Sequence, residues 1–92
     1  MNDNKLKILL AEDDTICQMS IGSYCKKLGV SLDTVNNGLE AVQKVKENKY
    51  NLILMDRYMP EMNGKEATEI IRSLENGSDT AIVALSGGKI II

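Results

Sequence analysis

The sequence contains no histidine, which removes most zinc sites and most pairs of a nucleophile with a histidine base from consideration. Its two cysteines, Cys17 and Cys25, lie in a segment that reads as one helix. Eight positions at about 1.5 Å per residue separate them by about 12 Å, too far for a disulfide within one helix. We therefore expect both cysteines to be small core residues.

A basic patch and a membrane-spanning run are also missing. The net charge is −2 and the lysines are scattered, so we expect no direct binding of nucleic acid. No apolar run is long enough to cross a bilayer, and the polar first residues do not resemble a signal peptide, so cytoplasm is the expected compartment. With 92 residues, 43% of them apolar, the chain is expected to form one globular domain over residues 1–92.

Short apolar strand patterns alternate with helical patterns along the chain. The strand patterns cover residues 5–11, 30–35, 52–55 and 81–85, and the second is mixed with polar residues, which places it at a sheet edge. Helical patterns lie between them, and the third runs from about residue 65 to residue 74. This alternation predicts an α/β fold with right-handed crossovers and a mostly parallel, doubly wound sheet.

The first helical pattern has two candidate starts. Thr15 with Gln18 three positions later fits a capping box, and Asp14 is a competing N-cap. Gly29 can end the helix in the left-handed conformation. The apolar periodicity predicts one buried stripe, made by Cys17, Ile21, Tyr24, Cys25 and Leu28.

The stretch 51–64, NLILMDRYMPEMNG, is the segment around which the chain is organised. An apolar strand runs directly into Asp56, and Pro60 stiffens the loop that follows. A carboxylate at the carboxyl end of a buried strand faces the crevice where open α/β sheets hold ligands. Taken alone, the stretch also fits an ordinary strand-loop-helix corner with a surface acid.

Polar groups follow three of the predicted strands at the same edge of the sheet. Glu12 and Asp13 end the first strand, Asp56 ends the third and Ser86 ends the fourth. Crowded carboxylates repel one another, and a divalent cation relieves that repulsion. An all-oxygen site favours Mg²⁺, with manganese or calcium as alternatives, and a metal beside an acid and a hydroxyl suits phosphoryl transfer.

With these residues, the chain resembles the response-regulator receiver domain of two-component signalling. The matching features are the acidic pair Glu12-Asp13, the segment Met55-Asp56 with Met59-Pro60 and Gly64, and Ser86. The resemblance implies a flavodoxin-like fold with strand order 2-1-3-4, the order found in a chemotaxis member of the family. It also implies a signalling domain that assists its own phosphorylation and is not an enzyme acting on other molecules.

The resemblance further implies a role for each of these residues. Asp56 is the expected phosphoacceptor, and a histidine kinase or a histidine phosphotransfer protein is the expected donor. Asp13, Asp56 and the backbone carbonyl of Tyr58 are the expected Mg²⁺ ligands, with Glu12 acting largely through water. Ser86 is expected to hydrogen-bond the phosphoryl group.

The sequence departs from the family at its end. The family has a further strand, flanked by helices and ending in a lysine, and none of these is found before Ile92. We therefore expect a C-terminally shortened domain in which the fourth strand is an open edge and one sheet face is partly bare, and we expect it to self-associate. One alternative function is an interaction module that has lost phosphorylation. A more distant one is a haloacid-type phosphatase, which needs an acid where this chain has Tyr58.

The tail, SGGKIII, gives a second hypothesis. An apolar strand, Gly87-Gly88 and another apolar run are typical of a two-residue hairpin. The register would place Lys89 opposite Ser86, Ile90 opposite Leu85 and Ile91 opposite Ala84. Lys89 would then lie near Asp56 and substitute for the missing lysine. The alternative is a fragment whose tail is frayed or is carried by another chain.

Overall fold

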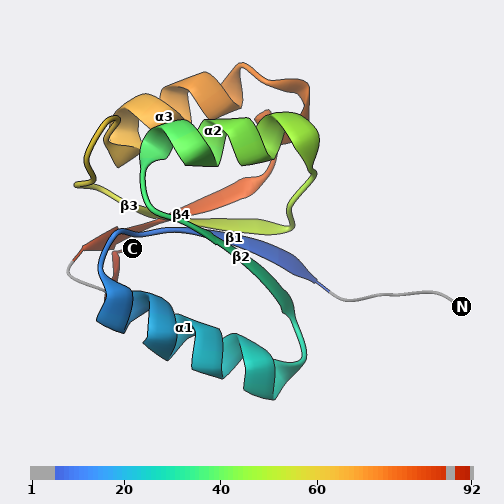
Figure 1. Ribbon diagram of the computed structural model, residues 1–92. Helices are drawn as coiled ribbons and strands as arrows, with labels where there is room; N and C mark the ends of the chain where they lie inside the picture. The colour runs from blue at the N-terminus through green and yellow to red at the C-terminus, as the bar shows by residue number, and fades with distance from the viewer. Residues whose placement is uncertain (1–5, 87–88, 92) are drawn as a thin grey trace, which may run out of the picture.

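The computed structural model describes residues 6–86 and 89–91, with side chains up to residue 85. It contains one five-stranded sheet with the order β2-β1-β3-β4-β5 (Figure 1). The first four strands pair in parallel, and β5 pairs antiparallel with β4. The strands are β1 Lys7–Ala11, β2 Ser31–Val35, β3 Leu52–Asp56, β4 Ala81–Ser86 and β5 Lys89–Ile91.

Helices cover both faces of this sheet. In Figure 1, α2 and α3 lie on one face and α1 lies on the other. The doubly wound fold and the order 2-1-3-4 expected from the sequence are therefore confirmed. None of the described helices has the length and apolarity needed to cross a membrane. The helices are α1 Thr15–Leu28, α2 Gly38–Glu47 and α3 Gly64–Arg72, with a 3₁₀ turn at Glu75–Gly77.

Alternate residues of the strands form the two halves of the core. Between the sheet and helices α2 and α3, the largest buried side chains are Leu9, Ile53 and Ile71, together with Tyr50. On the α1 face, Leu10, Leu54 and Leu85 form a smaller buried cluster. Because parallel strands are covered on both faces, their sequences read as continuous apolar runs.

Helix α1 differs from its predicted form at its N-terminus and along its buried stripe. Asp14, not Thr15, is the N-cap, and its side chain accepts hydrogen bonds from the backbone N–H groups of Ile16 and Cys17. Gly29 ends the helix with a φ of 73°, as expected. The predicted buried stripe is wrong at Tyr24 and Leu28, which are 67% and 76% exposed. Cys25 is the buried residue of this helix.

The tail pairs with β4 as a hairpin strand. Ser86 lies opposite Lys89, Leu85 opposite Ile90 and Ala84 opposite Ile91. The predicted register is therefore confirmed, and for residues 89–91 the frayed-tail alternative is wrong. As a result β4 is not an open edge, because β5 occupies that position. The turn predicted at Gly87-Gly88 lies outside the described residues.

Candidate functional site

Three carboxylates meet at the carboxyl edge of the parallel strands. One oxygen from each of Glu12, Asp13 and Asp56 lies within 4.8 Å of the others. Glu12 and Asp56 are buried, whereas Asp13 is exposed. The loops that follow β1, β2 and β3 all lie at this edge, on the left of Figure 1. The sequence prediction that these acids converge is therefore confirmed.

The electrostatics of this cluster favour a bound cation. Burial, and then the neighbouring Asp56 carboxylate, raise the pKa of the Glu12 carboxyl above its ordinary value. The carboxylates supply a set of hard oxygen ligands of the kind that Mg²⁺ prefers. Because a cation would offset the charge that the fold concentrates here, these residues fit the metal implied by the acidic pattern.

Backbone hydrogen bonds fix Glu12 in the loop after β1. Its N–H donates to the carbonyl of Val35 at 3.0 Å, and its carboxylate accepts from the N–H of Asp14 at 3.0 Å. The thiol of Cys17 lies beside this carboxylate. Burial, then its hydrogen bond to Glu12, raises the pKa of Cys17 to about 11, so the thiol remains protonated at neutral pH. Glu12 is therefore held in one position within the site.

The loop between β3 and α3 is closely packed around Asp56. The N–H of Gly64 donates to the carbonyl of Arg57 at 3.1 Å, and a Cβ at Gly64 would overlap the carbonyl oxygen of Asp56. Glu61 adopts a left-handed φ of 68°, a conformation that is uncommon for residues other than glycine. Glycine at position 64 thus allows the close approach that brings α3 against the site.

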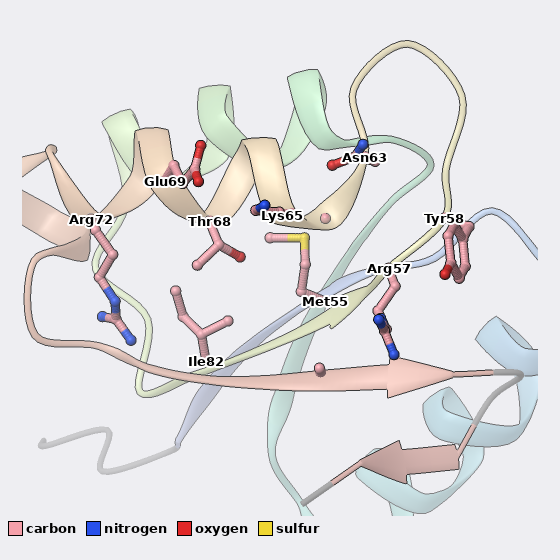
Figure 2. Close-up of a pocket in the computed structure, with 11 residues that line it drawn as sticks. Met55, Arg57, Tyr58, Asn63, Lys65, Thr68, Glu69, Arg72 and Ile82 are labelled. Atoms are coloured by element: carbon pink, nitrogen blue, oxygen red, sulfur yellow. The ribbon is translucent and has the colours of Figure 1, made fainter.

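Tyr58 lies in the loop that follows Asp56, and its side chain is 72% exposed. The guanidinium of Arg57 lies 5.7 Å from the centre of its ring. Beside them, a pocket of about 570 Å³ opens between α3 and β4. Figure 2 shows Met55 and Ile82 pointing into this pocket, with Arg57 and Tyr58 at one end of it and Arg72 at the other. Met55, Ile82 and Ala84 of the sheet line this hollow on the side opposite α3.

The two other predicted site residues are described only by their backbone. Ser86 ends β4 and Lys89 begins β5, and the two are paired in the hairpin. Asp56 is paired with Leu85, the residue before Ser86. The side chains of Ser86 and Lys89, and with them the predicted approach of Lys89 to Asp56, lie outside the described residues.

Sequence reasoning missed the role of Gln18. Instead of completing a capping box, its amide Nε2 donates to the backbone carbonyl of Glu12 and to Oδ1 of Asn36, the latter at 2.8 Å. Its periodic position on the first helix is the only signal for this role, because it places Gln18 in the turn nearest the acids.

Comparison with known proteins gives one consistent result. The family model for the response regulator receiver domain matches residues 8–90. "Probable histidine kinase 1" of Oryza sativa subsp. indica is 49% identical over 75 residues, which cover 82% of this chain but 8% of that protein. The chain therefore spans a small part of this relative.

Solved structures agree with the sequence match. The receiver domain of sensor histidine kinase PA1611 from Pseudomonas aeruginosa PAO1, with a magnesium ion coordinated in its active site cleft, has a TM-score of 0.85 and 36% identity, covering 87% of this chain and 66% of that one. The receiver domain of Ssk1 from Saccharomyces cerevisiae, crystallised with the phosphotransfer protein Ypd1, has a TM-score of 0.77 and 31% identity, covering 89% and 62%.

Proposed function

Because the chain belongs to the response regulator receiver domain family, we propose that it is a phosphoacceptor domain of a two-component phosphorelay, phosphorylated on Asp56. The observation that carries this proposal is the position of Asp56. It is the last residue of a buried central strand, and its carboxylate lies within 4.8 Å of two further carboxylates. A buried acid in such a cluster is an unfavourable structural residue but a suitable nucleophile.

Mg²⁺ is the proposed cofactor, held by Asp13, Asp56 and the backbone carbonyl of Tyr58, with Glu12 acting through water. When bound, the ion supplies positive charge that offsets the negative charge of phosphate oxygens. The three carboxylates, one exposed and two buried, supply oxygen ligands within 4.8 Å of one another. A related receiver domain that contains magnesium in its active site cleft supports the same choice.

The reaction is transfer of a phosphoryl group to a carboxylate oxygen. A P–O bond to Asp56 forms while the bond from phosphorus to the donor breaks. With a phosphohistidine donor, the imidazole nitrogen leaves and takes up a proton from water. Ser86 is the proposed hydrogen-bond donor to the phosphoryl group, and Lys89 is the proposed positive charge. Their pairing at the end of β4, next to the strand that carries Asp56, supports both roles.

A histidine kinase or a histidine phosphotransfer protein is the proposed partner, and cytoplasm the proposed compartment. Helix α1 begins directly after the acids and carries two exposed apolar residues in its first turns. Ile16 is 75% exposed and Met19 is 68% exposed. An apolar surface beside the acceptor carboxylate suits a protein donor, because it gives that donor a surface to bind while phosphorus approaches Asp56.

Labelling with a small phosphodonor tests this function. The native chain should incorporate phosphate from acetyl phosphate when Mg²⁺ is present, and Asp56→Asn should not. The matched control is Asp79→Asn, since Asp79 lies in an exposed pair with Lys49, far from the cluster in sequence. Undiminished labelling of Asp56→Asn would reject Asp56 as the acceptor. A native chain that is never labelled would favour the interaction module.

A further inference from the structure

The loop between β2 and α2 supplies none of the proposed metal ligands, yet it contacts both loops that do. Residues 36 and 37 lie between β2 and α2. On one side Gln18 connects this loop to Glu12. On the other side Gly38, the first residue of α2, connects it to the loop after Asp56. Neither Gln18 nor Gly38 belongs to the proposed ligand set, so any effect of these two residues on the reaction is indirect.

The first connection is made by a single amide group. Gln18 Nε2 donates to the carbonyl of Glu12 and, at 2.8 Å, to Oδ1 of Asn36. Asn36 is itself held, because its N–H donates to Oε1 of Glu40 in the first turn of α2 at 2.8 Å. Glu12 also donates its N–H to Val35, the last residue of β2, at 3.0 Å. The backbone of Glu12 is therefore bound at both its N–H and its carbonyl, directly to β2 and through Gln18 to the loop that follows it.

The second connection is a backbone hydrogen bond. The N–H of Gly38 donates to the carbonyl of Met62 at 3.0 Å, in the loop that carries Tyr58. A Cβ at position 38 would overlap that carbonyl oxygen, so only glycine allows this approach without a shift of the loop. Asn37 caps α2 by accepting from the N–H of Glu40 at 2.8 Å, which holds Gly38 in place.

These connections oppose a force that the site itself creates. Three carboxylates within 4.8 Å repel one another, and the loop that carries Glu12 and Asp13 would relax away from Asp56 if it were free. Metal affinity depends on ligands that are already in place, since any loop ordering on binding reduces the net free energy.

We propose that Gln18 and Gly38 are positioning residues that hold the two ligand-bearing loops at metal-binding separation through the β2–α2 loop. This inference rests on the proposed function, because it assumes that the carboxylates bind Mg²⁺. It goes beyond that function by assigning a role to residues that supply no ligand.

Titration calorimetry with Mg²⁺ alone tests the role of Gln18. Gln18→Met preserves the length of the side chain and removes both hydrogen bonds, so the affinity for Mg²⁺ should fall on the order of tenfold. Asn36→Ala should lower it in the same direction, and the double variant should lose little more than Gln18→Met. Gln43→Met is the matched control, because Gln43 lies on α2 away from both loops, and its affinity should equal that of the native chain.

A second measurement separates positioning from general stability. Labelling of Asp56 by acetyl phosphate in Gln18→Met should require more Mg²⁺ for half the maximal rate, while the rate at saturating Mg²⁺ stays close to native. Gly38→Ala should also require more Mg²⁺ for half the maximal rate if the variant folds. If it does not fold, the Gln18→Met measurement still tests the inference. Native affinity in Gln18→Met, or an equal loss in Gln43→Met, would overturn the inference alone. A native chain that binds no Mg²⁺ would instead overturn the proposed metal site.

Discussion

Asp56→Asn should make the metal-free protein more stable, although it removes the residue on which the proposed function depends. In the native chain, Asp56 places a negative charge beside those of Glu12 and Asp13, with oxygens within 4.8 Å. Asparagine has nearly the same shape but no charge, and its amide can donate a hydrogen bond to a neighbouring carboxylate. The substitution therefore removes repulsion without leaving a cavity.

The size of the effect follows from the separation of the charges. At 4.8 Å and an effective dielectric constant of about 20, two unit charges repel by about 3.5 kcal/mol. Solvent at the exposed Asp13 screens part of this energy, so we expect a gain of about 1–3 kcal/mol in the free energy of unfolding. Mg²⁺ at about a hundredfold excess over its dissociation constant adds about 2.7 kcal/mol to the native chain only. The advantage of Asp56→Asn should therefore shrink or reverse when Mg²⁺ is present.

Urea unfolding followed by circular dichroism, in EDTA and in saturating Mg²⁺, measures both effects. In EDTA the native chain should also lose stability as pH rises from the ordinary Glu12 value of 4.5 through its raised pKa, because the folded state binds that proton more tightly than the unfolded state. In Asp56→Asn the Asp56 charge is absent, so burial is the main cause that still raises the pKa of Glu12. The variant should therefore lose less stability than the native chain as pH rises. A variant less stable than the native chain in EDTA, at neutral pH, would refute the electrostatic reasoning.

Two further predictions concern the rest of the fold. Tyr50→Phe should cost about 1.5–3 kcal/mol in urea unfolding, because the buried hydroxyl of Tyr50 donates to Asp33 at 2.6 Å, whereas the exposed Tyr24→Phe should cost almost nothing. The chain should form dimers or larger assemblies at micromolar concentration, because the pocket beside Met55 and Ile82 leaves apolar surface open. A monodisperse monomer in light scattering would contradict the second prediction.

The sequence was sufficient to predict the convergence of the acids, because parallel strands end at one edge and Glu12, Asp13 and Asp56 each lie at the end of such a strand. The register of β4 against β5 was also predictable, since a hairpin signal of two residues between two apolar runs sets which residues face one another. The extent to which each residue of α1 is buried was not predictable. Periodicity gives the direction of a side chain but not the extent to which a helix overlaps the sheet, so Tyr24 and Leu28 were misplaced.

Gln18 shows a second limit of sequence reasoning. The pattern around Asp14 allows two caps, and the capping-box interpretation uses the Gln18 side chain locally. Once Asp14 takes the cap, that side chain is available, and its acceptors lie in two loops, one of them distant in sequence. Only the packing of α1 against the sheet brings them together, so no local rule can predict this contact.

The acidic residues are easy to recognise in the sequence, whereas the residues that contact their loops are not. A cluster of carboxylates is conspicuous in a sequence because charge is rare beside buried strands. The groups that hold it together need only a donor of the right reach or the absence of a side chain, as at Gln18 and Gly38. Such residues carry no charge. A search for charged or nucleophilic residues therefore finds the proposed ligands of this site and overlooks the residues that we propose position them.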